Sequence, residues 1–220
     1  MKSKFFFLAA LFAVTILACK NESKPTENAD SKTQTTATSA NACRYGVKSS
    51  DVHVNWTAYK TTKRVGVKGT FNEVAINTAS GTPNLNALIH ATSFKIDTKT
   101  VNSNNEGRDA KLVTFFFQKM AGDMAITGNV KSVEGDNSKG KGVLAINMNG
   151  MSKDTPFEYD VKDRVMTIHA TINTDNWNGQ DAIASINQAC KEKHTGEDGV
   201  SKTWPDVSVD VVVPLIVECE

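Results

Sequence analysis

The stretch that decides the fold is IHATSFKIDTKTVNSNNEGRDAKLVTFFFQKM, residues 89–120. It begins as a strand, because Phe94, Ile96 and Thr98 alternate with polar residues at the period of two that is typical of a half-buried sheet. A polar cluster that contains a glycine, residues 102–107, then ends the strand. The stretch therefore predicts a sheet that is apolar on one face and is interrupted by a polar loop.

A charged pair and an aromatic cluster follow the polar loop. Arg108 and Asp109 begin a short segment with helical character, which leads into Phe115, Phe116 and Phe117. A cation and an anion beside three phenylalanines predict a polar rim next to a large apolar interior.

Other short segments alternate in the same way, and turn residues separate them. They are residues 52–59, 65–71, 74–76, 124–130, 142–148, 153–161, 164–172 and 207–217. Asn149-Gly150, between two of these segments, is a strong hairpin signal. Residues 177–194 change to a helical period, with Ile183, Ile186 and Cys190 on one stripe. The pattern predicts an all-β fold, an antiparallel barrel of about eight strands with one or two short helices inserted.

The chain also resembles the YceI-like family of lipid-binding proteins. The resemblance rests on the strand and polar loop ahead of Arg108-Asp109, on the segment Val67 to Phe71, and on the segment Asn149 to Lys153, in their order along the chain. It extends over about residues 52–217. It implies a lipocalin-like barrel that encloses a polyisoprenoid or a similar amphiphile.

The interior of an eight-stranded barrel is either filled by side chains or just wide enough for one small ligand. Small residues at inward positions would leave space, and the candidates are Gly66, Gly69, Ala91, Gly128 and Ala145. The hypothesis is an apolar tunnel that binds a long isoprenoid or acyl chain by burying it. The predicted ligand-binding residues are Trp56, Phe71, Phe94, Arg108, Asp109, Phe115, Phe116, Phe117, Ile146 and Ile168. In the alternative interpretation, the aromatic residues only fill a solid core.

Two roles are open for the charged pair. Arg108 can form bidentate hydrogen bonds to a polar or phosphorylated ligand head. Alternatively, the pair ties the loop to the barrel rim, and Asp109 caps the short helix. The structural role is the preferred prediction.

No pattern in the sequence argues for catalysis, a cofactor or a metal. His53, His90, His169 and His194 form no H-x-H or HExxH motif, and no CxxC spacing occurs. Nucleophile-elbow, P-loop and dinucleotide-binding motifs are also missing from the sequence. A net charge of +1, with basic and acidic residues interspersed, does not favour nucleic acid as a partner. The predicted function is non-catalytic lipid binding, and the alternative is a cell-envelope interaction or stress module with a solid barrel and a loop-bound protein partner.

The N-terminal segment predicts export. Residues 1–18 read as a lipoprotein signal peptide, with a basic start and an apolar run too short to span a membrane. Residues 16–19 resemble a bacterial lipobox, which implies that Cys19 is lipidated; an ordinary signal peptide with a coincidental cysteine is the alternative. Residues 19–42 are polar and predict a flexible tether, and residues 43–220 form the YceI-like barrel domain.

The predicted location is the cell envelope of a Gram-negative bacterium, where the lipid would anchor the protein in the periplasm or at the outer membrane. The predicted partners are an isoprenoid or acyl-chain lipid and the membrane itself. A second copy of the chain, as a homodimer, is left open.

Three cysteines remain once Cys19 is set aside, an odd number for an oxidising compartment. The first and last strands of a closed antiparallel barrel are neighbours, which favours a disulfide between Cys43 and Cys219. Cys190 would then be a free thiol on the predicted helix. The competing pairing joins Cys43 to Cys190.

Overall fold

The structure is a computed structural model that describes residues 42–120 and 124–220. The predicted signal peptide, the lipidation site Cys19 and the tether up to residue 41 lie outside the described residues. Within the described ranges, no helix is long and apolar enough to cross a membrane.

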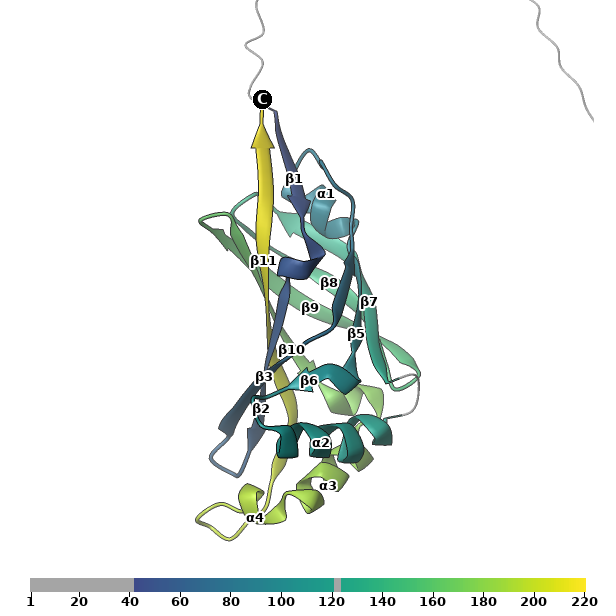
Figure 1. The fold of residues 1–220 in the computed structure, drawn as a ribbon, viewed down its shortest axis with the longest axis vertical. Helices are drawn as coiled ribbons and strands as arrows, with labels where there is room; N and C mark the ends of the chain where they lie inside the picture. Colours follow the sequence, from purple (N-terminus) through teal and green to yellow (C-terminus); the bar gives the residue numbers. More distant parts are fainter. Residues whose placement is uncertain (1–41, 121–123) are drawn as a thin grey trace, which may run out of the picture. The chain divides into compact units, whose positions relative to one another are not determined.

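The described chain is mainly β-strand with a few short helices (Figure 1). The strands are β1 Cys43–Val47, β2 His53–Lys60, β3 Val65–Phe71, β4 Val74–Asn77, β5 Ser93–Asp97, β6 Val101–Asn102, β7 Ala125–Gly135, β8 Lys139–Met148, β9 Met151–Lys162, β10 Val165–Asn173 and β11 Thr203–Cys219. The α-helices are α1 Leu85–His90, α2 Glu106–Phe115, α3 Gln180–Ala189 and α4 Lys191–His194. Short 3-10 turns are η1 Ser49–Asp51, η2 Thr98–Thr100, η3 Phe117–Lys119 and η4 Thr174–Trp177.

All these strands belong to one antiparallel sheet that closes on itself. Along the sheet the order is β4-β5-β7-β8-β9-β10-β11-β2-β3-β6. The two ends of this order are connected, because β3 continues along the chain into β4, and β5 continues into β6. These two broken strands pair with each other on both sides of their kinks, β4 with β5 and β3 with β6. Counting each broken strand as one position, and β1 with β2 because both pair along the same edge of β11, the sheet has the eight positions of the antiparallel barrel that the alternating pattern predicts.

The hydrogen bonds at the kink show how the barrel stays closed there. Asn72 N donates to Thr100 O at 3.0 Å, and Asp97 N donates to Glu73 O at 3.2 Å. The backbone ladder therefore continues through the irregular part of both strands. Such bends in paired strands are common at barrel corners.

The last strand is the longest, and it connects the two ends of the domain. β11 pairs with β10 along one edge and with β2 and then β1 along the other. Pro214, which has no N–H group, lies between the last pair with β2 (Val212 with His53) and the first pair with β1 (Leu215 with Val47). The missing donor therefore falls in the gap between two ladders.

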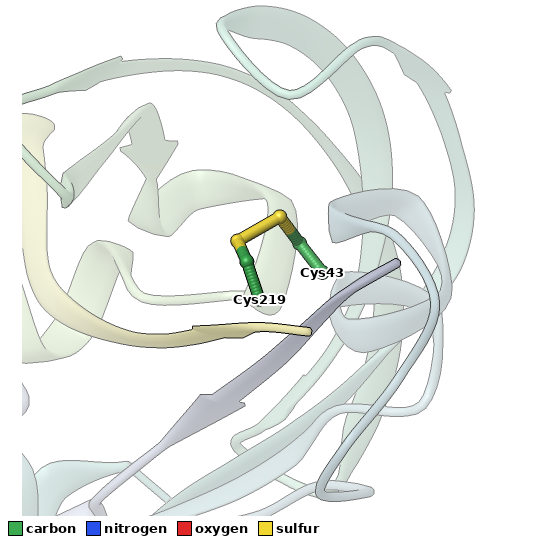
Figure 2. Close-up of a disulfide and its surroundings, with 2 residues drawn as sticks. All are labelled: Cys43 and Cys219. Carbon is green, nitrogen blue, oxygen red and sulfur yellow. A yellow bond between two sulfur atoms is a disulfide. The ribbon is translucent and has the colours of Figure 1, made fainter. Parts of the chain in front are cut away.

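Cys43 and Cys219 lie opposite each other in the β1–β11 ladder and form a disulfide (Figure 2). The bond joins residues 176 positions apart in the sequence. It confirms the predicted pairing, and Cys190 is a free cysteine.

Two elements of the structure are missing from the sequence prediction. No strand was predicted at residues 43–47, where β1 pairs along the end of β11. Helix α1 lies where the alternating stretch was expected to start, so Ile89 and His90 belong to the end of a helix. Its six residues are too few to show a helical period, although Asn84 caps it by accepting a hydrogen bond from Ala87 N at 2.8 Å.

The core is packed at the two ends of the barrel. Leu85, Leu88 and Ile89 of α1 are buried and close one end, in contact with residues of β7, β9 and β11. Trp177 and Ala182 are buried at the other end, against Ile146 of β8. Figure 1 shows α1 at one end of the barrel and α2, α3 and α4 at the opposite end, which we call the helical end.

Candidate functional site: an apolar cavity with a cationic end

A cavity of about 580 Å³ lies inside the barrel, between the two packed ends. In β2, Val54, Trp56 and Ala58 line it, because alternate residues of a strand face the same side of the sheet. The volume lies within the range of roughly 300–1,000 Å³ that is usual for small-molecule sites. The barrel therefore has room for a ligand.

The apolar residues of the middle layers remain accessible. Leu144, Ile168 and Val209 line the cavity, and each is only partly buried. In an interior filled by side chains, residues at these inward positions would be fully buried in close packing. The alternative of a solid barrel therefore does not fit the structure.

Most of the predicted ligand-binding residues lie on this cavity. Those in its lining are Trp56, Phe71, Phe94, Arg108, Phe116, Phe117, Ile146 and Ile168. The cluster of phenylalanines forms part of the wall at the helical end, where the rings of Phe71 and Phe117 meet edge to face with centroids 6.1 Å apart. The predicted helical stripe also faces the cavity, through Ile183, Ile186 and Cys190.

Asp109 and Phe115 do not line the cavity. The carboxylate of Asp109 accepts hydrogen bonds from the backbone N, at 2.9 Å, and from the hydroxyl of Ser103, so it ties the polar loop to α2. The cap of α2 is Asn105, whose side chain accepts from Arg108 N at 2.9 Å. The prediction that Asp109 caps the helix is thus wrong. Phe115 lies on the outer side of α2 and is 36% exposed.

The prediction that small residues create the cavity is also wrong. Gly69 and Gly128 have inward positions, but the rings of Trp56 and Phe94 occupy the space beside them. Gly66, Ala91 and Ala145 are not part of the lining. These small residues give room to neighbouring aromatic rings or lie outside the lining, and the alanines that do line the cavity are Ala58 and Ala170.

The two ends of the cavity differ in charge. Near α1 the polar lining residues are Thr78 and Thr92, whose hydroxyls are 2.9 Å apart. At the helical end the lining contains Lys60, Arg108, Lys111, Lys193 and His194. The lining residues that the structure describes include no aspartate or glutamate.

Among these basic residues, only Arg108 was predicted from the sequence. Lys60 continues the inward alternation of Val54, Trp56 and Ala58, and His194 continues the stripe of the α3 segment. A basic residue that extends an apolar face was thus a usable signal for both positions.

Hydrogen bonds hold two of the lysines in place. Lys60 Nζ donates to Lys193 O at 2.9 Å, and Lys111 Nζ donates to Ala189 O at 3.1 Å. Both acceptors lie at the C-terminal ends of short helices, where backbone carbonyls lack helical partners.

His194 is part of a polar network beside these lysines. Its Nδ1 lies 2.7 Å from Thr203 Oγ1, and Asn187 Oδ1 accepts a hydrogen bond from the same hydroxyl at 2.9 Å. Burial lowers the pKa of His194 below its ordinary value, and the nearby charges of Lys60 and Lys111 lower that pKa further. The imidazole is therefore neutral near pH 7.

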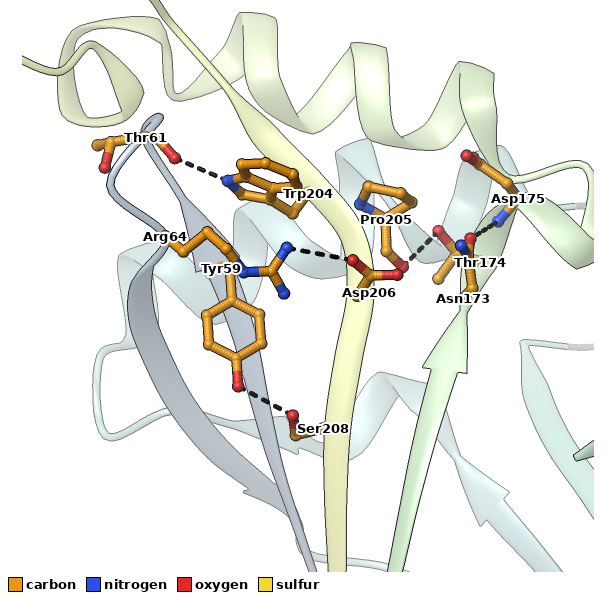
Figure 3. Close-up of polar contacts among 10 residues, drawn as sticks. All are labelled: Tyr59, Thr61, Arg64, Asn173, Thr174, Asp175, Trp204, Pro205, Asp206 and Ser208. Atoms are coloured by element: carbon orange, nitrogen blue, oxygen red, sulfur yellow. Dashed lines mark hydrogen bonds and ion pairs between the residues drawn. The ribbon is translucent and has the colours of Figure 1, made fainter. Parts of the chain in front are cut away.

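The rim next to Lys60 is fixed by a stacked arginine (Figure 3). The guanidinium of Arg64 lies 4.6 Å from the ring centre of Tyr59 and 4.4 Å from that of Trp204. Arg64 also pairs with Asp206 at 3.2 Å, and Trp204 Nε1 donates to Thr61 O at 2.7 Å. These contacts attach the β2–β3 hairpin to the start of β11.

One histidine on the outer surface has two acidic partners. His169 Nδ1 lies 2.7 Å from Asp210 Oδ1, and its Nε2 lies 3.0 Å from Asp160 Oδ1. Hydrogen bonding to Asp210, followed by that to Asp160, raises the pKa of His169 above its ordinary value. In residues 42–120 and 124–220, no group of three or more His, Cys, Asp or Glu side chains is arranged to hold a metal ion.

The fold and the cavity define a lipocalin-like β-barrel with an apolar internal site. Residues 45–215 match the model of the YceI-like domain, and the chain belongs to this family.

Solved structures of low sequence identity share the fold. A polyisoprenoid-binding domain from Saccharophagus degradans is 13% identical, with a TM-score of 0.52, and the match covers 82% of this chain and 99% of that one. BcnA from Burkholderia cenocepacia is 10% identical, with a TM-score of 0.53, and the match covers 78% of this chain and 99% of that one. The comparison with curated protein sequences gives no match.

Proposed function

We propose that the protein binds a polyisoprenoid or another long-chain amphiphile inside the barrel, and that it does so without catalysis. The observation that carries this proposal is the 580 Å³ cavity, whose middle layers consist of partly buried aliphatic and aromatic side chains. Membership of the YceI-like family and the shared fold of a polyisoprenoid-binding domain support the same class of ligand.

The energetics favour a long chain over a short one. Burying one methylene contributes about 0.8 kcal/mol. Association itself costs roughly 4–15 kcal/mol in lost freedom of motion. On the order of five to twenty buried methylenes are therefore needed before binding becomes favourable, which the tail of an isoprenoid or fatty acid supplies.

Native mass spectrometry and displacement of a fluorescent fatty acid test the proposal. We expect a lipid to co-purify with the protein, and we expect affinity to rise with chain length. Ala170→Phe places a ring in the cavity and should weaken binding of the fluorescent fatty acid at least ten-fold. Thr171→Phe is the matched control, because Thr171 is the next residue of β10 and is exposed on the outer face.

Urea unfolding of both variants separates loss of the cavity from loss of the fold. If Ala170→Phe does not fold, Ala58→Phe in β2 serves the same purpose. A protein that carries no lipid and binds no long-chain fatty acid would contradict the proposal. The same native spectra report whether the protein is a monomer or a homodimer.

We also propose that the protein is an exported lipoprotein anchored through Cys19 in the envelope of a Gram-negative bacterium. The N-terminal sequence supports this proposal, and a disulfide between Cys43 and Cys219 fits an oxidising compartment. Incorporation of labelled palmitate and recovery in the membrane fraction should both be lost in Cys19→Ser. Equal membrane recovery of the two proteins would contradict the lipid anchor.

A further inference from the structure

The helical end of the cavity carries positive charge that no acidic group in the described chain neutralises. The ion pairs among the described residues leave out Lys60, Arg108, Lys111 and Lys193. The acidic residues of the same helices, Glu106, Asp109, Asp181 and Glu192, are not part of the cavity lining, and the carboxylate of Asp109 is engaged by Ser103. An apolar cavity thus ends in a group of four cations.

These cations come from three separate parts of the chain. Lys60 lies at the end of β2, Arg108 and Lys111 lie on α2, and Lys193 lies on α4. The three elements meet at the helical end of the cavity, where Lys60 Nζ donates a hydrogen bond to Lys193 O of α4. The first turn of α2 also lines the cavity through Gly107, so the positive end of that helix adds to the same potential.

His194 lies in the cavity lining beside these cations. Burial lowers its pKa, and the charges of Lys60 and Lys111 lower that pKa further. A bound anion at this place would act on the imidazole in the opposite direction. Lys193, another of the four cations, precedes His194 on the same short helix.

We propose that the helical end of the cavity holds an anionic head group, a phosphate, diphosphate or carboxylate, of the bound amphiphile, whose tail extends toward α1. The inference rests on the proposed lipid binding and adds a selectivity for anionic over uncharged amphiphiles. Arg108 offers a planar fork of donors to such an anion, and the lysines act as point charges. An uncharged alcohol would leave these four cations without an anionic partner.

Ligands with the same tail and different heads test this selectivity. Geranylgeranyl diphosphate and geranylgeraniol form one pair, and hexadecanoate and hexadecanol form another, so that phosphate and carboxylate heads are separated. A charge-assisted hydrogen bond contributes about 1.5–3 kcal/mol. We therefore expect the anionic member of at least one pair to bind about ten-fold tighter or more, and the difference to shrink in 1 M salt.

Charge-removing variants locate the head group. Arg108→Gln and Lys193→Gln should each weaken binding of the anionic ligand about ten-fold and leave binding of the alcohol unchanged. Lys191→Gln is the matched control, because Lys191 lies on the same helix as Lys193 but outside the cavity lining. We expect its affinities to equal those of the unmodified protein.

The pKa of His194, followed by NMR, supplies a readout that does not depend on affinity. An anion bound beside the imidazole favours the protonated form, so the diphosphate should raise this pKa and the alcohol should not. Equal affinities for charged and uncharged ligands, with no effect of either variant, would overturn the head-group site while lipid binding stands. Failure of all four ligands to bind would overturn both proposals.

Discussion

Trp56 lies opposite Gly69 in the β2–β3 ladder, and its indole ring occupies the place that a side chain at position 69 would take. The ring is also fixed by its Nε1, which donates to Thr70 O at 3.1 Å. The wall of the cavity at this point depends on a glycine that has no conformational role of its own.

Gly69→Ala should lower the free energy of unfolding by about 1–3 kcal/mol, the usual cost of overpacking a well-packed site. The added methyl group would meet the Trp56 ring and the backbone carbonyl of Asn102, and the carbonyl cannot rotate away. Urea unfolding measures the change. Gly46→Ala in β1 is the control, because its Cβ would meet only an ordinary contact at 3.8 Å, and equal losses in the two variants would contradict the explanation.

Removing the disulfide should destabilise the domain strongly. In the chain-entropy model, closing a loop of this length lowers the entropy of the unfolded chain by an amount equivalent to about 5 kcal/mol. Cys43→Ser with Cys219→Ser, or reduction by dithiothreitol, should lower the free energy of unfolding by up to that amount. Cys190→Ser, which removes the free cysteine, is the control. An unfolding midpoint that is insensitive to dithiothreitol would count against a stabilising bond.

Arg64→Ala should cost about 1–2 kcal/mol of stability, since two stacking contacts of about 0.5–1 kcal/mol each are lost. Arg64→Lys should recover only part of this, because an ammonium cannot stack flat between Tyr59 and Trp204 as a guanidinium does.

Lys63→Ala is the comparison for the arginine variants. It removes an exposed ion pair with Glu197 in the same hairpin, and exposed pairs contribute about 0–1 kcal/mol. Chemical denaturation measures the free energy of unfolding of the three variants. If Arg64→Lys were as stable as the unmodified protein, the charge of Arg64 and not its stacking would account for the effect.

The contribution of His169 to stability should depend on pH. Because Asp210 and Asp160 raise its pKa in the folded state, the protonated imidazole stabilises the fold. This stabilisation is complete below the pKa of the unfolded chain, about 6.5, and is lost as pH rises through the folded-state value. His169→Gln should therefore destabilise the protein more at pH 5.5 than at pH 9. Asp210→Asn should remove most of the difference, and a loss that is the same at both pH values would contradict the assignment.

The regular part of the barrel could be predicted because its signals are local. Asn149-Gly150 forms the expected hairpin turn, with both residues at positive φ, between strands β8 and β9. The pairing of Cys43 with Cys219 followed from one global rule, that the first and last strands of a barrel are neighbours. Each inference needed only a short pattern and a fold class.

The sequence could not show which side chains from distant segments occupy each position in the barrel interior. Gly69 and Gly128 read as empty space, yet rings from adjacent strands fill it. Arg108 and Asp109 read as one pair, yet one faces the cavity and the other binds Ser103. The cationic end depends on β2, α2 and α4 meeting at one end of the cavity, and no local pattern encodes that meeting.

The position of β11 has a consequence for how the protein folds. This strand follows all the others in the described chain, and until it is in place, β1, β2 and β10 each lack a hydrogen-bonding partner along one edge. Hairpins between neighbouring strands can therefore form early, but neither the closed barrel nor the Cys43–Cys219 bond can form before β11 has joined the sheet. Closure depends on contacts of large sequence separation, which are slow to form.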